Sequence, residues 1–318
     1  MLKMYLARER GGGEAAFWEA GWALQALEDM VASYALHPLC APLARLVPRR
    51  DWVLDGGCGL GALAVYLARR GYRVIGVDFA LGALRVLRAA APGVPACAGR
   101  VDALPLAAGS VAAYYSGGVI EHFEEGPAAA LREAHRVLQP GGLFLVVVPD
   151  LSPLRQWLYP GSRQVLCDGA RPVAAFERVA APGRTPAPEP GLRFFQYLYH
   201  RQELRGWLQA AGFQVLWDRG YGVQWALMEL PAVQALGRRL RGPILEAAID
   251  YWDRVPQAPW AQEPLLPPRL PGPAARLLRR WLTLEDDRLL LLGGALRLWQ
   301  QVASNLRLYV CQRPAWRA

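Results

Sequence analysis

Apolar and polar residues follow two different periods along residues 51–150. Short apolar runs such as "WVLD" and "RVIGVD" alternate with longer segments such as "GALAVYLARRG" and "ALGALRVLRAA", in which apolar residues recur every three or four positions. The first pattern is typical of buried strands and the second of amphipathic helices. Because parallel strands need crossover connections, this alternation predicts an α/β fold with a mostly parallel sheet covered by helices on both faces.

The regions on either side depart from this alternation. Helical spacing in "EAAFWEAGWALQALEDMVASYAL" predicts an N-terminal helical cap over residues 1–50. Residues 151–192 are rich in proline and arginine and leave from the carboxyl edge of the predicted sheet, where ligands bind in open α/β folds, so we expect a lid insertion there. Residues 193–221 return to helix and strand and continue the core. Residues 222–304 predict a second, mainly helical insertion, and residues 305–318 hold a last core strand, "LRLYVCQ", and a tail.

The charge of the chain suggests one class of partner, which the motifs do not support. The 318 residues carry a formal net charge of +9, and almost every basic residue is arginine, with Lys3 as the single lysine. A nucleic-acid partner is one interpretation of such a charge. No arginine-rich block or stacking motif accompanies it, so we interpret the charge as a feature of composition and expect no nucleic-acid partner.

Cysteine spacing and apolar runs limit the metal sites and the compartment. The five cysteines are scattered without a C-x-x-C pair, which argues against a zinc site or a disulfide framework, and we expect no metal. No apolar run reaches the roughly 18 residues that a membrane-spanning helix needs, and the N-terminus lacks the apolar segment of a signal peptide. These features predict a cytoplasmic protein.

The stretch "VLDGGCGLG" carries the most specific chemistry. Glycine at four positions allows a ligand to approach the main chain closely. A pyrophosphate is usually held by G-x-G-x-x-G, whereas the spacing here is G-x-G-x-G. Asp55 precedes the glycines, and its carboxylate would repel a pyrophosphate but suit the ammonium group of an amino-acid moiety. The four glycines are Gly56, Gly57, Gly59 and Gly61.

Five motifs in order resemble one enzyme family. "VLDGGCGLG", "VIGVDFA", "VDALPL", "GGVIEHF" and "AHRVLQPGGLFLVVVP" are similar to the class I S-adenosylmethionine-dependent methyltransferases, and more narrowly to the branch that methylates quinones, lipids, sugars and other small molecules. The resemblance covers about residues 52–150 and resumes with "YHRQELRGWLQAAGFQVL". It implies a Rossmann-like sheet of seven strands whose last strand is antiparallel, and S-adenosyl-L-methionine as cofactor.

The resemblance also implies roles for individual residues in binding the cofactor. Asp55 and Gly57 would hold its methionine end, and Gly56, Gly59 and Gly61 would complete the loop. Asp78, which ends the second strand, is placed to accept both ribose hydroxyls. The other predicted contacts are Phe79 beside the adenine, Asp102 and Ala103 flanking it, and Ser116 below the sulfonium.

The reaction requires alignment and, for a hydroxyl nucleophile, a base. His122 and Glu121 follow the fourth strand, near the place where the methyl group should emerge, and we interpret them as candidate catalytic residues. His122 is the better candidate because an unperturbed histidine titrates near pH 6.5. The alternative is that both residues are structural.

Other functions and partners remain open at this stage. A module that binds S-adenosylmethionine without catalysis and an NAD-dependent oxidoreductase are the alternative functions. An RNA or protein methyltransferase is disfavoured, because "SGGVIEHF" stands where amide-methylating enzymes carry Asn/Asp-Pro-Pro-Tyr/Phe. We expect a small-molecule or lipid-like acceptor. Arginine and tryptophan within 235–282 suggest peripheral membrane contact, and a packed helical subdomain or a homodimer face would explain them as well.

Overall fold

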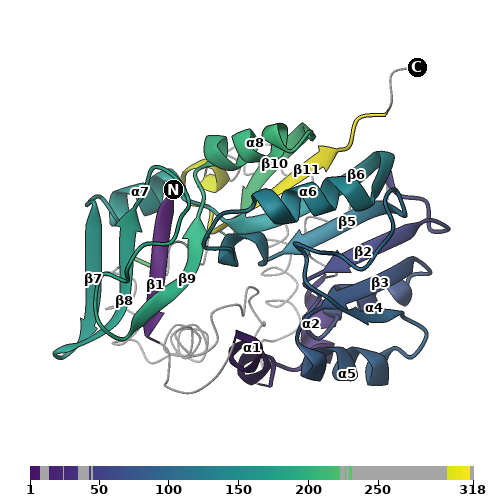
Figure 1. Ribbon diagram of the computed structural model, residues 1–318, viewed down its shortest axis with the longest axis horizontal. Coiled ribbons are helices and arrows are strands. Elements are labelled where there is room, and N and C mark those ends of the chain that lie inside the picture. The colour runs from purple at the N-terminus through teal and green to yellow at the C-terminus, as the bar shows by residue number, and fades with distance from the viewer. Residues whose placement is uncertain are drawn as a thin grey trace, which may run out of the picture.

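The computed structural model describes residues 1–7, 14–23, 25–34, 43, 46–222, 226, 229–230 and 299–315 (Figure 1). Its core is a seven-stranded sheet in the order β10-β11-β6-β5-β2-β3-β4. Only β11 runs antiparallel to its neighbours in this described sheet. The predicted Rossmann-like α/β fold with an antiparallel last strand is therefore confirmed. The strands are β2 (Trp52–Gly56), β3 (Arg73–Asp78), β4 (Ala96–Ala98), β5 (Val111–Gly117), β6 (Leu138–Pro149), β10 (Gln214–Tyr221) and β11 (Leu306–Gln312).

Helices cover both faces of this sheet because both faces are apolar. Val53 packs in one buried cluster with α2 (Leu27–Ser33) and α4 (Ala62–Ala68), and α5 (Leu81–Ala90) joins them. The next residue, Leu54, points to the opposite face, since successive side chains of a strand alternate. That face packs against α6 (Ala128–Val137) and α8 (Arg201–Ala210). The strands are thus buried on both sides, as a parallel sheet requires.

A second sheet of four antiparallel strands stands beside the core, in the order β7-β8-β1-β9 (Figure 1). Its central strand β1 comes from the very start of the described chain, and its other strands come from the segment that follows β6. The strands are β1 (Leu2–Ala7), β7 (Arg163–Asp168), β8 (Arg171–Arg178) and β9 (Leu192–Leu198).

This second sheet corrects two expectations from the sequence. The prediction that residues 1–50 are helical is right for α1 (Glu14–Trp22) and α2 but wrong for residues 2–7, which form β1. A six-residue apolar run does not reveal whether it is strand or helix, and its partners lie about 170 residues away. The expected lid at 151–192 is likewise an ordered region, in which a short helix α7 (Pro153–Leu158) precedes β7 and β8.

Two predictions fall mostly on residues outside those that the structure describes. These are the helical insertion at 222–304 and the membrane contact within 235–282; of the former, residues 299–302 are described and helical. Within the described part of the chain, none of the helices combines the length and the apolar character needed to cross a bilayer. The same residues hold no cluster of side chains suited to a metal ion.

Candidate functional site

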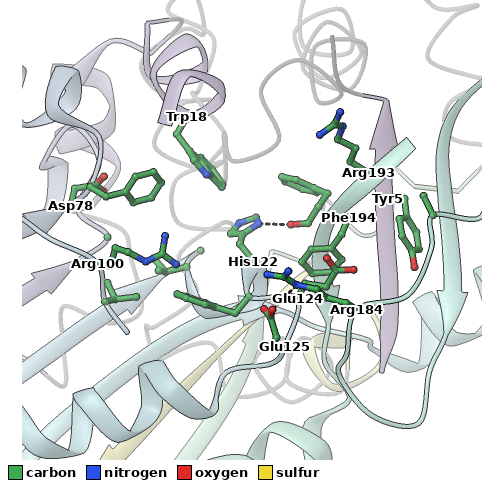
Figure 2. Close-up of a pocket in the computed structure, with 18 of the residues that line it drawn as sticks. Tyr5, Trp18, Asp78, Arg100, His122, Glu124, Glu125, Arg184, Arg193 and Phe194 are labelled. Atoms are coloured by element: carbon green, nitrogen blue, oxygen red, sulfur yellow. Dashed lines mark hydrogen bonds and ion pairs between the residues drawn. The ribbon is translucent and has the colours of Figure 1, made fainter. Parts of the chain in front are cut away.

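A cavity of about 530 Å³ opens between the carboxyl ends of the core strands and the second sheet (Figure 2). We call its two ends the core half and the outer half. The core half is lined by Gly57, Asp78, Phe79, Gly99, Arg100, Val101, Gly118 and Val119. The outer half is lined by Tyr5, Glu124, Glu125, Arg184, Thr185, Ala187, Leu192, Arg193, Phe194 and Phe195. His122 and Phe123 lie at the junction, and Trp18 and Trp22 reach it from α1.

Two features of the loop between β2 and α4 favour glycine, namely its backbone dihedral angles and the lack of room for a side chain. Gly57 has φ +75°, in the left-handed region that favours glycine, and a Cβ there would come within 2.4 Å of Val119. Gly59 has φ +51°, and a Cβ there would meet the indole of Trp22 at 2.2 Å. Gly57 lines the cavity, whereas Gly59 lies under α1. Gly56 and Gly61 are packed against Tyr114 and Leu87 and do not line the cavity.

Asp55 lies behind this loop rather than in the cavity wall. Its side chain is buried, and its Oδ2 accepts a hydrogen bond of 3.2 Å from the amide of Ala64 in the first turn of α4. Burial, with a smaller contribution from the negative charge of Asp78, raises the pKa of Asp55 to about 7, although the hydrogen bond from Ala64 opposes the rise. Asp55 thus interacts with the N-terminus of α4, where a helix favours a negatively charged side chain. Direct contact between Asp55 and an ammonium group stays a prediction.

Asp78 at the end of β3 does reach the cavity, and its carboxylate is held in place by the main chain. Oδ2 accepts from the amide of Gly59 and Oδ1 from the amide of Ala80, both at 2.8 Å. Burial raises the pKa of Asp78, while these backbone hydrogen bonds oppose the rise. A carboxylate has about four lone-pair positions, so two remain for ligand hydroxyls. Phe79, the next residue in sequence, also lines the cavity.

The residues predicted to flank the adenine, Asp102 and Ala103, are tied to Arg100, and their contact with the cofactor stays a prediction. Asp102 is held by Arg100, whose Nε and Nη2 donate to its carboxylate at 3.0 and 3.2 Å. The amide of Ala103 donates to the carbonyl of Arg100 at 3.2 Å and closes a turn. Arg100 lines the cavity, and Asp102 and Ala103 do not. Ser116 is also absent from the lining, because it is fully buried within β5.

His122 occupies the junction between the two halves (Figure 2). It ends the short 3-10 helix η2 (Ile120–His122), and its Nδ1 lies 2.7 Å from the carbonyl oxygen of Phe195 on β9. The ring of Trp18 meets the imidazole edge-to-face at 4.7 Å. If Nδ1 carries the proton and donates to the Phe195 carbonyl, Nε2 keeps its lone pair and is able to accept a proton.

Glu121 lies beneath this histidine and is out of the cavity. Its side chain has no exposed surface, and its Oε1 is 4.0 Å from Nε2 of His122. Burial raises the pKa of Glu121 to about 8, so the carboxyl group is mostly protonated at neutral pH. The two candidate catalytic residues are therefore not equivalent, since only His122 lines the cavity.

Sequence reasoning missed the outer half of the cavity. Its rim depends on β1 and β9, whose paired residues, such as Leu2 and Leu198, lie far apart in the sequence, so no local motif marks Tyr5 or Phe195. Trp18 is different, because helical spacing placed it in the N-terminal cap. Arg100 could have been found from the sequence, since it stands two residues before the predicted site residue Asp102 in "GRVD".

Comparisons with known proteins agree with the resemblance. A family model described as a methyltransferase domain matches residues 54–146. Over 221 residues the chain is 31% identical to a protein of Mycolicibacterium smegmatis named "Probable S-adenosylmethionine-dependent methyltransferase", covering 70% of this chain and 71% of that protein. It is 34% identical over 126 residues to a malonyl-[acyl-carrier protein] O-methyltransferase of Serratia marcescens, covering 40% of this chain and 48% of that enzyme.

A solved structure also matches the fold of this chain. It is the chain that forms a complex with the Haloferax volcanii Trm112 methyltransferase activator, and it matches with a TM-score of 0.51 and 18% identity over 96% of this chain and 98% of that one. At this identity the likeness concerns the fold alone.

Proposed function

Because this chain belongs to the S-adenosylmethionine-dependent methyltransferases, we propose that it transfers the methyl group of that cofactor to a small molecule bound in the outer half of the cavity. The observation that carries the proposal is the continuity of one cavity from Gly57 and Asp78, past His122, to the second sheet. Its volume lies in the range that small ligands occupy in proteins. The proposal also covers a lipid-like acceptor of which only the reactive end enters the outer half of the cavity.

The core half fits the cofactor in its chemistry. Gly57 leaves the main chain open to the ligand, the fixed carboxylate of Asp78 offers acceptor positions for two ribose hydroxyls, and Phe79 offers an aromatic face for the base. Arg100 and Val101 complete the wall where the base would lie. When bound, S-adenosylmethionine supplies an electrophilic methyl group on a sulfonium that departs as a neutral thioether.

The protein's own part in the reaction is alignment and proton transfer. The acceptor's lone pair forms the new bond to the methyl carbon, and the electrons of the carbon–sulfur bond stay on sulfur. We assign His122 Nε2 to take the proton that the acceptor loses, with the Phe195 carbonyl holding the ring in the required tautomer. Trp18, packed on the imidazole, keeps water from that side.

Calorimetry tests the cofactor assignment. We expect the protein to bind S-adenosylmethionine and S-adenosylhomocysteine but not NAD. Asp78→Ala should weaken the affinities for both ligands at least about tenfold, because this is the factor expected for the loss of one hydrogen bond to a charged group. Asp51→Ala is the matched control, because Asp51 precedes β2 and does not line the cavity. Binding of NAD in place of S-adenosylmethionine would contradict the proposal.

A screen for methyl transfer tests the catalytic assignment. Quinones, lipids and glycosides with free hydroxyl or amine groups are incubated with S-adenosylmethionine, and formation of S-adenosylhomocysteine is measured. We expect turnover with one of these classes. Tight cofactor binding without turnover on any of them would favour the non-catalytic binding module instead.

A further inference from the structure

The charged side chains that line the outer half are unequally paired. Glu124 accepts from Lys3 at 2.7 Å, and Glu125 pairs with Arg184 at 2.6 Å. Arg193 is exposed on β9 and lines the cavity, and no hydrogen bond or ion pair to it occurs among the residues that the structure describes. The described outer half therefore holds one positive charge that its own carboxylates do not neutralise.

The buried Lys3 explains why Glu124 is not available to a cationic acceptor. The lysine has no exposed surface, and its ammonium group also donates to the carbonyl of Gly183 at 2.9 Å and to Oγ1 of Thr185 at 2.8 Å. All three of its donors are thus used. A cationic acceptor would find the charge of Glu124 already neutralised by Lys3 and would also meet the positive charge of Arg193, so the charge of the outer half disfavours it.

The position of Arg193 on the strand relates it to the proposed base. The carbonyl that holds His122 belongs to Phe195, two residues further along β9, which corresponds to about 7 Å between the two Cα atoms. The side chain of Phe194, the intervening residue, points to the opposite face of β9, where its ring lies near the ammonium group of Lys3, and it lines another part of the cavity wall. Figure 2 shows Arg193 and Phe194 on the side of His122 away from Asp78.

We propose that the methyl acceptor carries one anionic group, most simply a carboxylate, which Arg193 binds while the nucleophile of the acceptor lies at His122. A guanidinium matches a carboxylate through two parallel hydrogen bonds, and the pairing gives orientation as well as affinity. This inference rests on the proposed function and narrows its substrate class.

A matched pair of probes tests the role of Arg193. Binding of 4-hydroxybenzoate and of 4-hydroxybenzamide, which share ring and hydroxyl but differ in charge, is measured by calorimetry in the presence of saturating S-adenosylhomocysteine. We expect the carboxylate to bind at least about tenfold more tightly than the amide. Arg193→Gln should abolish this preference, whereas Arg171→Gln, an exposed arginine on β8 outside the cavity lining, should retain it.

Each outcome bears on the inference. Equal binding of the two probes, binding of neither, or a preference that survives Arg193→Gln would overturn it. The affinity for S-adenosylhomocysteine alone separates this failure from failure of the proposed function. If the cofactor product binds and a neutral acceptor is methylated, the enzyme assignment stands and only the anionic acceptor is excluded.

Discussion

The two halves of the cavity differ in the chemical groups that their walls present to a ligand. The core half presents main-chain surface at Gly57 and one carboxylate, Asp78, which two backbone amides hold in place. The outer half presents side chains, and its polar wall is organised around the fully buried ammonium group of Lys3. A wall made of backbone and one fixed acid suits a ligand that never changes. A wall made of side chains is readily altered by substitution, so this is where we expect acceptor specificity to reside.

The largest expected effect concerns the junction of the two halves. His122→Ala should lower the rate of methyl transfer to a hydroxyl acceptor by about 100- to 10,000-fold, because a general base contributes that much. The affinity for S-adenosylmethionine should change little, since Asp78 and Gly57 are untouched. Single-turnover kinetics and calorimetry measure the two quantities. A fall in cofactor affinity with an unchanged rate would mean that His122 belongs to the core half and is not the base.

A smaller effect is expected when a substitution removes the hydrogen bonds of Lys3 in the outer half and leaves the core half unchanged. Lys3→Met removes three hydrogen bonds and leaves Glu124 without its cation, so the free energy of unfolding should fall by about 2–3 kcal/mol. Cofactor affinity should remain within about twofold of the wild type if the two halves are independent. Denaturant titration and calorimetry provide these values.

The matched control for Lys3 is an exposed ion pair on the core. Arg69 bonds Glu28 at 2.7 Å, with both side chains largely exposed, so Arg69→Met should lower the free energy of unfolding much less than Lys3→Met does. An equal loss of stability in the two variants would show that burial of the Lys3 network contributes nothing beyond a surface pair.

The smallest effect sharpens the distinction between Glu121 and His122. Burial raises the pKa of Glu121 from 4.5 to about 8, so between these pH values the folded chain holds a proton that the unfolded chain has lost. The stabilising contribution of this proton is complete below pH 4.5 and is lost as the pH rises through about 8.

Glu121→Gln should remove this dependence. Relative to the wild type, the variant should gain about 1 kcal/mol or more between about pH 5 and about pH 8.5, measured by denaturant titration. Glu125→Gln serves as the control, because the side chain of Glu125 is 62% exposed and should show no such gain. If the difference in the free energy of unfolding between Glu121→Gln and the wild type does not change across this pH range, Glu121 is not a buried, protonated carboxyl group.

The part of the site that could be predicted is the part that local sequence encodes. Alternation of strand and helix gives the order of the core elements, and the ends of parallel strands meet at one edge, so Gly57 and Asp78 were correctly expected near one another. The local sequence does not specify which partner within the protein a side chain selects. Asp55 turns to the first turn of α4, and Asp102 turns to Arg100.

The amino-acid sequence by itself determined the order of strands and helices in the core, the glycine loop and the family, because the period of each element and the spacing within each motif are local features of the chain. Only the tertiary structure decided that residues 2–7 are a strand, that β9 brings its carbonyl to His122, and that Lys3 is buried beside Glu124. These features join segments up to about 180 residues apart, for example Lys3 and Gly183. No local pattern specifies such pairings, since they form only when the whole chain has packed.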